Sequence, residues 1–332
     1  MLKRYLLVVL VVTLLTTATL TAGEAASKVI TVRLGHGADP VHPWHTAALK
    51  FAEIVEQKSN GRVKVQVYTA GQLGNDREMT EAVQAGTLEM AVVSTMAMSA
   101  FEPSIQLFDL PYLFPDYKTA YRILDGPIGE KVASKLIPKG LRGLAYWEND
   151  FRCMSNSVRP ITRVADLKGL KMRVPETPIL MDWIRRVGAD PTPMAFTELY
   201  NALQQEVVDG QDNGIHLSFS ARYYEVQKYY TLTNHIYAPA LMLYSELKWR
   251  QLPADLQKII QDAAIETRDL QRKLNAELRN DRLEQMKKSG LQVTVLSKEA
   301  LKEFMESAEP TYKQFENVVG KDLLNQVLRE TR

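Results

Sequence analysis

The sequence predicts an α/β protein with two domains and a long helix that bridges them. The chain has 332 residues, more than one ordinary domain needs. Strand-like and helix-like segments alternate over residues 30–94, and the alternation starts again near residue 150. An unbroken helical pattern from Pro253 to Ser289 would be roughly 50 Å long, which exceeds the width of one small domain.

Strands and helices alternate in the first half of the chain. Residues 30–36 and 62–68 alternate apolar with polar positions, as half-buried strands do, whereas 88–94 is an apolar run typical of a strand buried on both faces. Helical periodicity covers residues 44–59 and 76–85. This order of elements predicts a largely parallel sheet.

The second half is expected to repeat this arrangement. Its predicted strands are residues 141–147, 151–157, 166–174 and 237–245. Its predicted helices, each closed by a glycine, are residues 178–188 and 196–210, and VDGQDN (208–213) is interpreted as a polar turn. The long helical pattern has an apolar seam that suits a strut across two domains, with a coiled-coil dimer as the alternative.

The composition is that of a soluble globular protein, with 45% apolar and 24% charged residues. Basic and acidic residues nearly balance, 41 against 39, and no basic stripe with interleaved aromatic residues occurs. A nucleic-acid partner is therefore not expected.

The N-terminus has the pattern of a secretory signal peptide. Lys3 and Arg4 precede the apolar run 5–15, and small residues follow it. A membrane anchor is the alternative, but the 11 residues of the apolar run are short for a bilayer span. We expect residues 1–25 to be a signal peptide cleaved near Ala25, and the mature protein to be periplasmic.

The sequence contains none of the common catalytic motifs. GxSxG, HExxH, GxxxxGK[ST], GxGxxG and CxxC are all absent. The single cysteine, Cys153, excludes an internal disulfide and is more typical of a small buried side chain than of a nucleophile. The chain is not expected to be an enzyme or to hold a cofactor.

One cluster could ligate a metal. Asp39, His42 and His45 lie close together in DPVHPWH, and the two histidines are spaced to share a helix face. The preferred interpretation is a helix N-terminus with a cap near His42 and Pro43 in the first turn, and no metal is expected.

Three polar residues have strongly apolar or turn-like surroundings. Arg152 lies in WENDFRCM, Arg173 lies in KMRVP, and Asn213 closes VDGQDN. A buried arginine needs a partner, and the pattern alone favours an internal carboxylate or backbone carbonyl. The alternative partner is the carboxylate of a ligand, because the planar fork of a guanidinium can donate two parallel hydrogen bonds to it.

Several long segments resemble the DctP-like family, the periplasmic substrate-binding subunits of tripartite ATP-independent (TRAP) transporters. The similarity extends over essentially the whole chain after Val29. The segments, in chain order, are GQLGNDREMTEAVQAGTLEM (71–90), FDLPYLF (108–114), DLKGLKMRVP (166–175), GADPTPMAFTELYNALQQEVVDGQDN (188–213) and YYEVQKYYTLTNH (223–235).

This resemblance implies a periplasmic-binding-protein-like fold, with two α/β domains around a ligand cleft and a long helix that bridges them. It implies that residues 27–149 plus 239–278 form domain I and that residues 150–238 plus 279–332 form domain II. The protein is then a receptor that gives an organic acid to two integral-membrane permease subunits, which use an ion gradient. We expect a monomer.

The resemblance also assigns site residues. The ligand-anchoring arginine of the family falls on Arg173, its second arginine on Arg152, and its asparagine on Asn213. Similarity to the sialic-acid-binding branch adds four positions that border the cleft: Asp76, Ser94, Phe196 and Glu176. The chain departs from that branch at Ser94, Ala97 and Glu176, so sialic acid is not the expected ligand.

A closer resemblance, in WENDFR, SNSVRPI and HPWHTAA, is to receptors for sugar acids such as uronates and diketogulonate. Phe196 is expected either to stack on a sugar face or to pack in the core. A C4-dicarboxylate receptor and a receptor that serves a sensor kinase are the alternatives. The side chains expected to bond ligand hydroxyls are Asp76, Ser94, Thr95, Glu176, Asn213 and His42.

Overall fold

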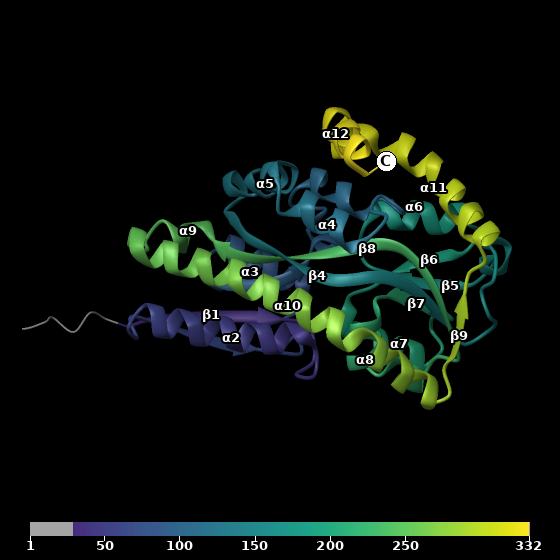
Figure 1. The fold of residues 1–332 in the computed structure, drawn as a ribbon, viewed down its shortest axis with the longest axis horizontal. Coiled ribbons are helices and arrows are strands. Elements are labelled where there is room, and N and C mark those ends of the chain that lie inside the picture. The colour runs from purple at the N-terminus through teal and green to yellow at the C-terminus, as the bar shows by residue number, and fades with distance from the viewer. Residues whose placement is uncertain (1–28, 332) are drawn as a thin grey trace, which may run out of the picture.

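The computed structural model describes residues 29–331 and shows one mixed sheet of nine strands covered by helices (Figure 1). The strand order is β2-β1-β3-β8-β4-β7-β5-β6, and β9 pairs with β8. Residues 29–331 contain no helix with the length and apolar character that crossing a bilayer requires. The predicted signal peptide and its cleavage site lie outside the described residues.

The first part of the sheet consists of parallel strands joined by helices. These elements are β1 (Ile30–His36), α2 (Pro43–Lys58), β2 (Val63–Tyr68), α3 (Asp76–Gln84) and β3 (Met90–Ser94). Each lies within two residues of its predicted bounds, so the predictions are confirmed. Side chains cap both helices: the His42 ring accepts from the Trp44 N–H, and Asn75 forms a capping box with Glu78.

A group of short helices follows β3 and covers one face of the sheet. They are η1 (Thr95–Met98), η2 (Pro103–Asp109), α4 (Tyr117–Leu124), α5 (Pro127–Ser134) and η3 (Ile137–Lys139). Their apolar side chains form one core with those of β3 and β8, including the fully buried Phe108 and Val132. Burial of apolar surface holds this layer on the sheet.

Two long antiparallel strands cross from one part of the sheet to the other. They are β4 (Leu141–Asn156) and β8 (Tyr229–Ser245). The prediction of two separate strands, 141–147 and 151–157, was wrong because the acidic segment between them forms a bulge inside β4. Asp150 has a φ of 71°, and Arg279 of the long helix bonds the buried carboxylates of Glu148 and Asp150.

The second part of the sheet repeats the parallel arrangement. Its elements are η4 (Val164–Leu167), β5 (Lys171–Val174), α6 (Pro178–Arg186), β6 (Asp190–Pro193), η5 (Phe196–Glu198), α7 (Leu199–Gln204), β7 (Gly210–Asn213), α8 (Ile215–Ser220) and η6 (Tyr223–Glu225). The helix predicted over 196–210 is shorter than expected, since the chain turns at Glu206 with a φ of 56°.

The interpretation of VDGQDN as a turn was wrong, because its last four residues form the central strand β7 between β4 and β5. The polar side chains of this strand are satisfied inside the protein. Gln211 donates to the Ser155 hydroxyl at 2.8 Å, and Asp212 pairs with Arg152. Their polarity therefore reflects internal hydrogen bonding and not exposure to water.

The predicted long helix is confirmed as α10 (Ala254–Lys288), which follows the short α9 (Glu246–Trp249). α10 runs along the length of the molecule and packs on α2, β4 and α8 (Figure 1). The first part of its apolar seam, Leu256, Ile260 and Ala263, is buried within the chain, whereas Leu270, Leu274 and Leu278 are half-buried. The buried part of the seam is thus used internally, which favours the strut over a coiled-coil dimer.

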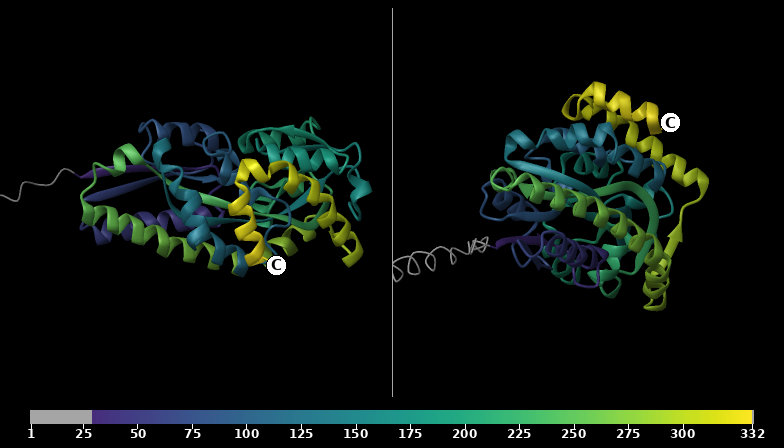
Figure 2. Two further views of the ribbon diagram at one scale, coloured as in Figure 1. Left: turned by 90° about the horizontal axis from the view of Figure 1, so that it is seen from above. Right: turned by 60° about the vertical axis from the view of Figure 1, so that its left-hand side comes forward.

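The C-terminal elements wrap back over the outside of the sheet. They are β9 (Gln292–Val295), α11 (Lys298–Val319) and α12 (Lys321–Thr331). α11 packs on α6 and η2, and α12 packs on α4 (Figure 2). Arg122 of α4 bonds Glu330 of α12. The last helix, α12, therefore contacts the first part of the fold. In contrast, β9 pairs with the first residues of β8, Tyr229–Leu232.

Candidate functional site

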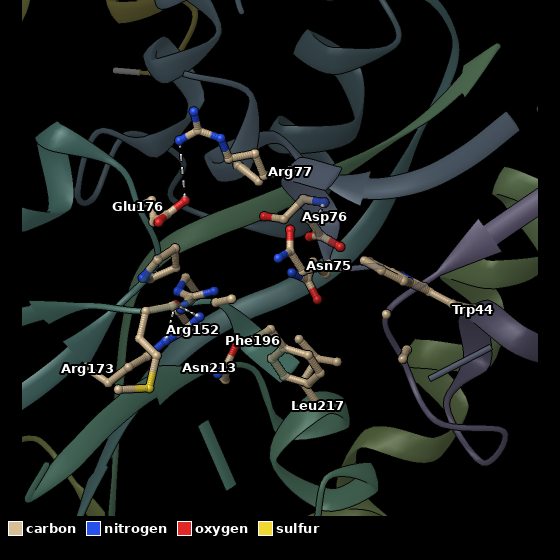
Figure 3. Close-up of a pocket in the computed structure, with 18 residues that line it drawn as sticks. Trp44, Asn75, Asp76, Arg77, Arg152, Arg173, Glu176, Phe196, Asn213 and Leu217 are labelled. Atoms are coloured by element: carbon tan, nitrogen blue, oxygen red, sulfur yellow. Dashed lines mark hydrogen bonds and ion pairs between the residues drawn. The ribbon is translucent and has the colours of Figure 1, made fainter. Parts of the chain in front are cut away.

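A cavity lies at the carboxyl ends of parallel strands from both parts of the sheet (Figure 3). One wall comes from the ends of β1 and β3 and from the first turn of α3. The facing wall comes from β4 and β7 and from the segments that follow β5 and β6. Ligands of open α/β sheets bind at this edge, so the cavity is the candidate site.

The cavity is lined by seven of the nine residues that the sequence predicted, together with Trp44, Asn75, Arg77 and Asn149. The seven are Asp76, Ser94, Arg152, Arg173, Glu176, Phe196 and Asn213. Thr95 and His42 lie elsewhere. Thr95 is buried and donates to the carbonyl of Pro239 at 3.0 Å. His42 is buried at the N-terminal cap of α2, and the centroid of its ring lies 6.2 Å from that of the His216 ring. Internal contacts thus hold both side chains away from the cavity.

Arg173 projects from β5 and is only 3% exposed. Its Nε and Nη2 atoms donate to the carbonyl of Met194 at 3.0 and 2.6 Å. No carboxylate among residues 29–331 forms an ion pair with it. Burial lowers the pKa of Arg173 to about 10, so the guanidinium remains charged at neutral pH. The site therefore holds a buried cation that forms no direct ion pair within the described residues, although Asp76 and Asp212 act on it at longer range.

Arg152, which is 2% exposed, has a permanent partner. Its Nε lies 2.5 Å and its Nη2 2.9 Å from the two carboxylate oxygens of Asp212, which neighbours it on β7. The Oδ2 atom of this carboxylate also lies 3.1 Å from Nε2 of His235, and Trp183 stacks on the His235 ring. Burial alone would raise the pKa of Asp212, but Arg152 and His235 hold it well below its ordinary value.

The pattern-based interpretation of the two arginines is thus correct for Arg152, whose partner is an internal carboxylate. It is also correct for Arg173, which bonds a backbone carbonyl and forms no ion pair with a carboxylate among residues 29–331. Arg152, Asn213 and Arg173 lie on the neighbouring strands β4, β7 and β5. This adjacency brings together three groups that are far apart in the sequence, and each of them can donate a hydrogen bond to an anion.

Asp76 is the acidic group of the wall formed by the ends of β1 and β3 and the first turn of α3. It opens α3, and its Oδ2 accepts from the Ser94 backbone N–H at 3.0 Å. Burial raises the pKa of Asp76 to about 6, against the opposite effects of that N–H and of Arg173. A carboxylate in this position can accept hydrogen bonds from hydroxyl groups of a ligand.

This raised pKa predicts that Asp76→Asn stabilises the unliganded protein at high pH. Between pH 3.8 and about 6 the native carboxyl binds more protons than the unfolded one, so the free energy of unfolding decreases as pH rises through this interval. The variant lacks that decrease. We expect it to be about 3 kcal/mol more stable than the wild type at pH 7.5 and about equal at pH 4.

Urea denaturation at pH 4, 5, 6 and 7.5 measures this difference. Thr80→Val, at a neighbouring buried position of the same helix, provides a control without a titrating group. A difference between Asp76→Asn and wild type that is independent of pH would contradict the raised pKa.

Two polar atoms of the lining residues have no hydrogen-bond partner among the described residues. They are the Ser94 hydroxyl and the side-chain amide oxygen of Asn149 (Oδ1), and both are buried. Buried polar atoms are normally satisfied, so these two atoms are available for hydrogen bonds with a bound ligand. Asn149 and Arg77 lie within the segments WENDFR and NDREM, but only the bulge of β4 and the start of α3 show that they reach the cavity.

The histidine cluster near α2 does not form a metal site. Residues 29–331 contain no group of three or more His, Cys, Asp or Glu side chains that could hold a metal ion. The Nδ1 atom of His45 lies 3.2 Å from Nε2 of His36. The His42 ring is not part of this contact and accepts from the Trp44 N–H. The arrangement is that of a helix N-terminus, as the preferred interpretation predicted.

The DctP family model, described as "Bacterial extracellular solute-binding protein, family 7", matches residues 34–318. The chain belongs to this family. Members of the DctP family are solute-binding receptors and not enzymes, and the protein is therefore a receptor.

Individual DctP relatives cover most of the chain. The 2,3-diketo-L-gulonate-binding periplasmic protein YiaO of Escherichia coli is 35% identical over 79% of this chain and 80% of its own. The C4-dicarboxylate-binding periplasmic protein DctP of Rhodobacter capsulatus is 36% identical over 80% of each chain.

A solved structure shows the same fold. The sugar acid binding protein DctPAm from Advenella mimigardefordensis, in complex with galactonate, has a TM-score of 0.90 and 36% identity, and the match covers 92% of this chain and 98% of that one. The receptor therefore has the two α/β domains and the ligand cleft of TRAP periplasmic binding proteins, as expected.

Proposed function

We propose that this DctP-family receptor binds a sugar acid of the uronate or diketogulonate type and delivers it to a TRAP transporter for ion-gradient-driven uptake. The observation that supports this most directly is the buried Arg173, with which no carboxylate of the described chain forms an ion pair. A buried unpaired charge is unfavourable, and the carboxylate of a ligand would remove that penalty. A neutral ligand would leave it in place.

The rest of the cavity supports a ligand with hydroxyl groups. The Ser94 hydroxyl and the side-chain amide oxygen of Asn149 have no hydrogen-bond partner among the described residues. The Asp76 carboxylate lies on the same wall as Ser94. Phe196 lines the opposite wall and could cover one face of a sugar ring. The galactonate of DctPAm and the diketogulonate of YiaO belong to this chemical class. The C4-dicarboxylate named for the Rhodobacter capsulatus relative is the alternative.

The proposed mechanism is closure of the two domains around the ligand. We assign residues 27–149 plus 239–278 to one domain and 150–238 plus 279–332 to the other, with α12 reaching back onto α4. The ligand carboxylate binds Arg173 on one domain, and closure brings Asp76 and Ser94 of the other domain onto its hydroxyls. Because the closed form binds the ligand more tightly, the ligand shifts the population toward it.

The bulge of β4 is a suitable hinge. The strand changes register between Glu148 and Phe151, and Asp150 has a left-handed backbone conformation. We also propose that the chain is exported with cleavage near Ala25, works as a monomer in the periplasm, and docks in its closed form on two integral-membrane permease subunits.

A thermal-shift screen tests the ligand class. Glucuronate, galacturonate, galactonate, 2,3-diketogulonate, succinate and sialic acid are compared with glucose, galactose and alanine. A ligand that binds only the native state at 100 times its Kd adds about 2.7 kcal/mol of stability. We expect a sugar acid to raise the Tm by several degrees and the neutral sugars to have no effect. Shifts with neutral sugars or amino acids alone would overturn the proposal.

A further inference from the structure

Three arginines line the cavity: Arg77, Arg152 and Arg173. A ligand with one carboxylate needs one of them, whereas a dicarboxylate needs two. An arginine that already has a carboxylate partner in the protein offers little to a second anion, because its charge is balanced. The ion pairs within the site therefore decide how many arginines remain for the carboxylates of a ligand.

Two of the three arginines have such partners. Arg152 forms two bonds to the carboxylate of Asp212. Arg77 lies between two carboxylates, with its Nε 3.1 Å from Glu81 and its Nη1 3.9 Å from Glu176. Arg173 has no ion pair among residues 29–331. In the described part of the chain, Arg173 is thus the one arginine of the cavity that remains for a ligand carboxylate.

The Arg77–Glu176 pair joins the two walls of the cavity. Arg77 is in the first turn of α3, and Glu176 follows the end of β5, and the two side chains point toward one another in Figure 3. Both side chains are about half exposed, at 53% and 50%, so the pair itself adds little stability. Its importance lies in its position: both residues line the cavity, and Asp76 adds a second negative group beside Arg77.

We propose that the Arg77–Glu176 ion pair restricts this receptor to monocarboxylates. The inference rests on the proposed function and narrows it. The single carboxylate of an aldonate or uronate binds Arg173, and the uncharged hydroxyl end of the ligand lies toward Arg77. The second carboxylate of an aldarate or C4-dicarboxylate meets the carboxylates of Glu176 and Asp76, with no unpaired cation to balance it.

Calorimetric titration with matched ligands tests this selectivity. Galactonate and galactarate share a six-carbon skeleton and differ by one carboxylate, and glucuronate with glucarate and erythronate with tartrate provide two more pairs. We expect the wild type to bind the monocarboxylate of at least one pair about tenfold or more tightly than its dicarboxylate. Glu176→Gln removes the repulsion and leaves Arg77 with only its exposed pair to Glu81, so it should shift the affinity ratio about three- to tenfold toward the dicarboxylate.

Two further variants identify the cause of this shift in the affinity ratio. The double variant Arg77→Gln/Glu176→Gln also lacks the Arg77 cation, and we expect it to lose most of the gain. Glu266→Gln is the matched control, because it also removes one negative charge from a half-exposed ion pair between two elements, in this case with Lys58. Since Glu266 lies outside the cavity, this control should keep the wild-type ratio.

The outcomes separate this inference from the proposed function. If none of the sugar acids binds, the proposed function fails. If sugar acids bind but the wild type does not distinguish the members of a pair, or Glu176→Gln leaves their ratio unchanged, the selectivity inference fails and the receptor function stands. A shift of equal size in Glu266→Gln would also overturn the inference, because it would show an effect of net charge alone.

Discussion

Arg173→Lys is expected to reduce the affinity for the sugar-acid ligand by about 30-fold or more while leaving the fold intact. The substitution keeps the positive charge but removes the planar fork that donates two parallel bonds to a carboxylate. A hydrogen bond to a charged group is worth about 1.5–3 kcal/mol, so losing one of the pair accounts for a loss of this size. Titration calorimetry of wild type and variant with the best ligand of the screen measures it.

The Tm of the unliganded variant distinguishes a ligand-binding role from a structural one. Among residues 29–331 the Arg173 side chain bonds only the carbonyl of Met194, and a lysine amine can also donate to that oxygen. We therefore expect the unliganded Tm to change by at most a few degrees. Strong destabilisation together with unchanged affinity would show that Arg173 supports the fold and that the ligand carboxylate binds elsewhere.

The sequence predicted much of the fold because its periodicity is local information. Residues 30–94 form their strands and helices where the alternation of apolar and polar positions predicts them, and α10 has nearly its predicted length. The errors occurred where tertiary contacts override local pattern. β7 looks like a turn because its side chains are polar, yet Gln211 and Asp212 bond partners on β4 that no local pattern reveals.

The candidate site shows the same division. Arg173 and Asn213 could be selected because they lie in recognisable motifs, and both line the cavity. The partner of Arg152 could not be assigned, since Asp212 is 60 residues away in the chain and belongs to the segment taken for a turn. Arg77 and Glu176 are surface-like in sequence, and only the approach of α3 to the end of β5 makes them a pair.

The buried pair of Arg152 and Asp212 gives the second large expected effect, which is on stability. Asp212→Asn preserves the shape of the side chain but removes the charge that balances Arg152, and its amide group cannot accept the second guanidinium bond. Breaking a buried pair in this way leaves an uncompensated charge. We expect the free energy of unfolding at pH 7 to decrease by about 3–5 kcal/mol, as measured by urea denaturation.

The exposed pair of Arg62 with Asp255 supplies the control for this effect. Asp255→Asn also breaks an arginine–aspartate contact, but both side chains are well exposed, so a change of at most about 1 kcal/mol is expected. A similar loss in both variants would show that burial of the Arg152 pair has little energetic consequence.

The pH dependence provides an independent test of the same ion pair. Because Arg152 and His235 hold the pKa of Asp212 well below 3.8 in the folded protein, this carboxylate contributes stability above pH 4 and loses it as pH falls toward the native pKa. The stability gap between wild type and Asp212→Asn should therefore be constant from pH 7 to pH 5 and narrow below pH 4. A gap that persists unchanged to pH 2.5 would contradict the ionised pair, because the cause would then be altered packing and not the lost charge.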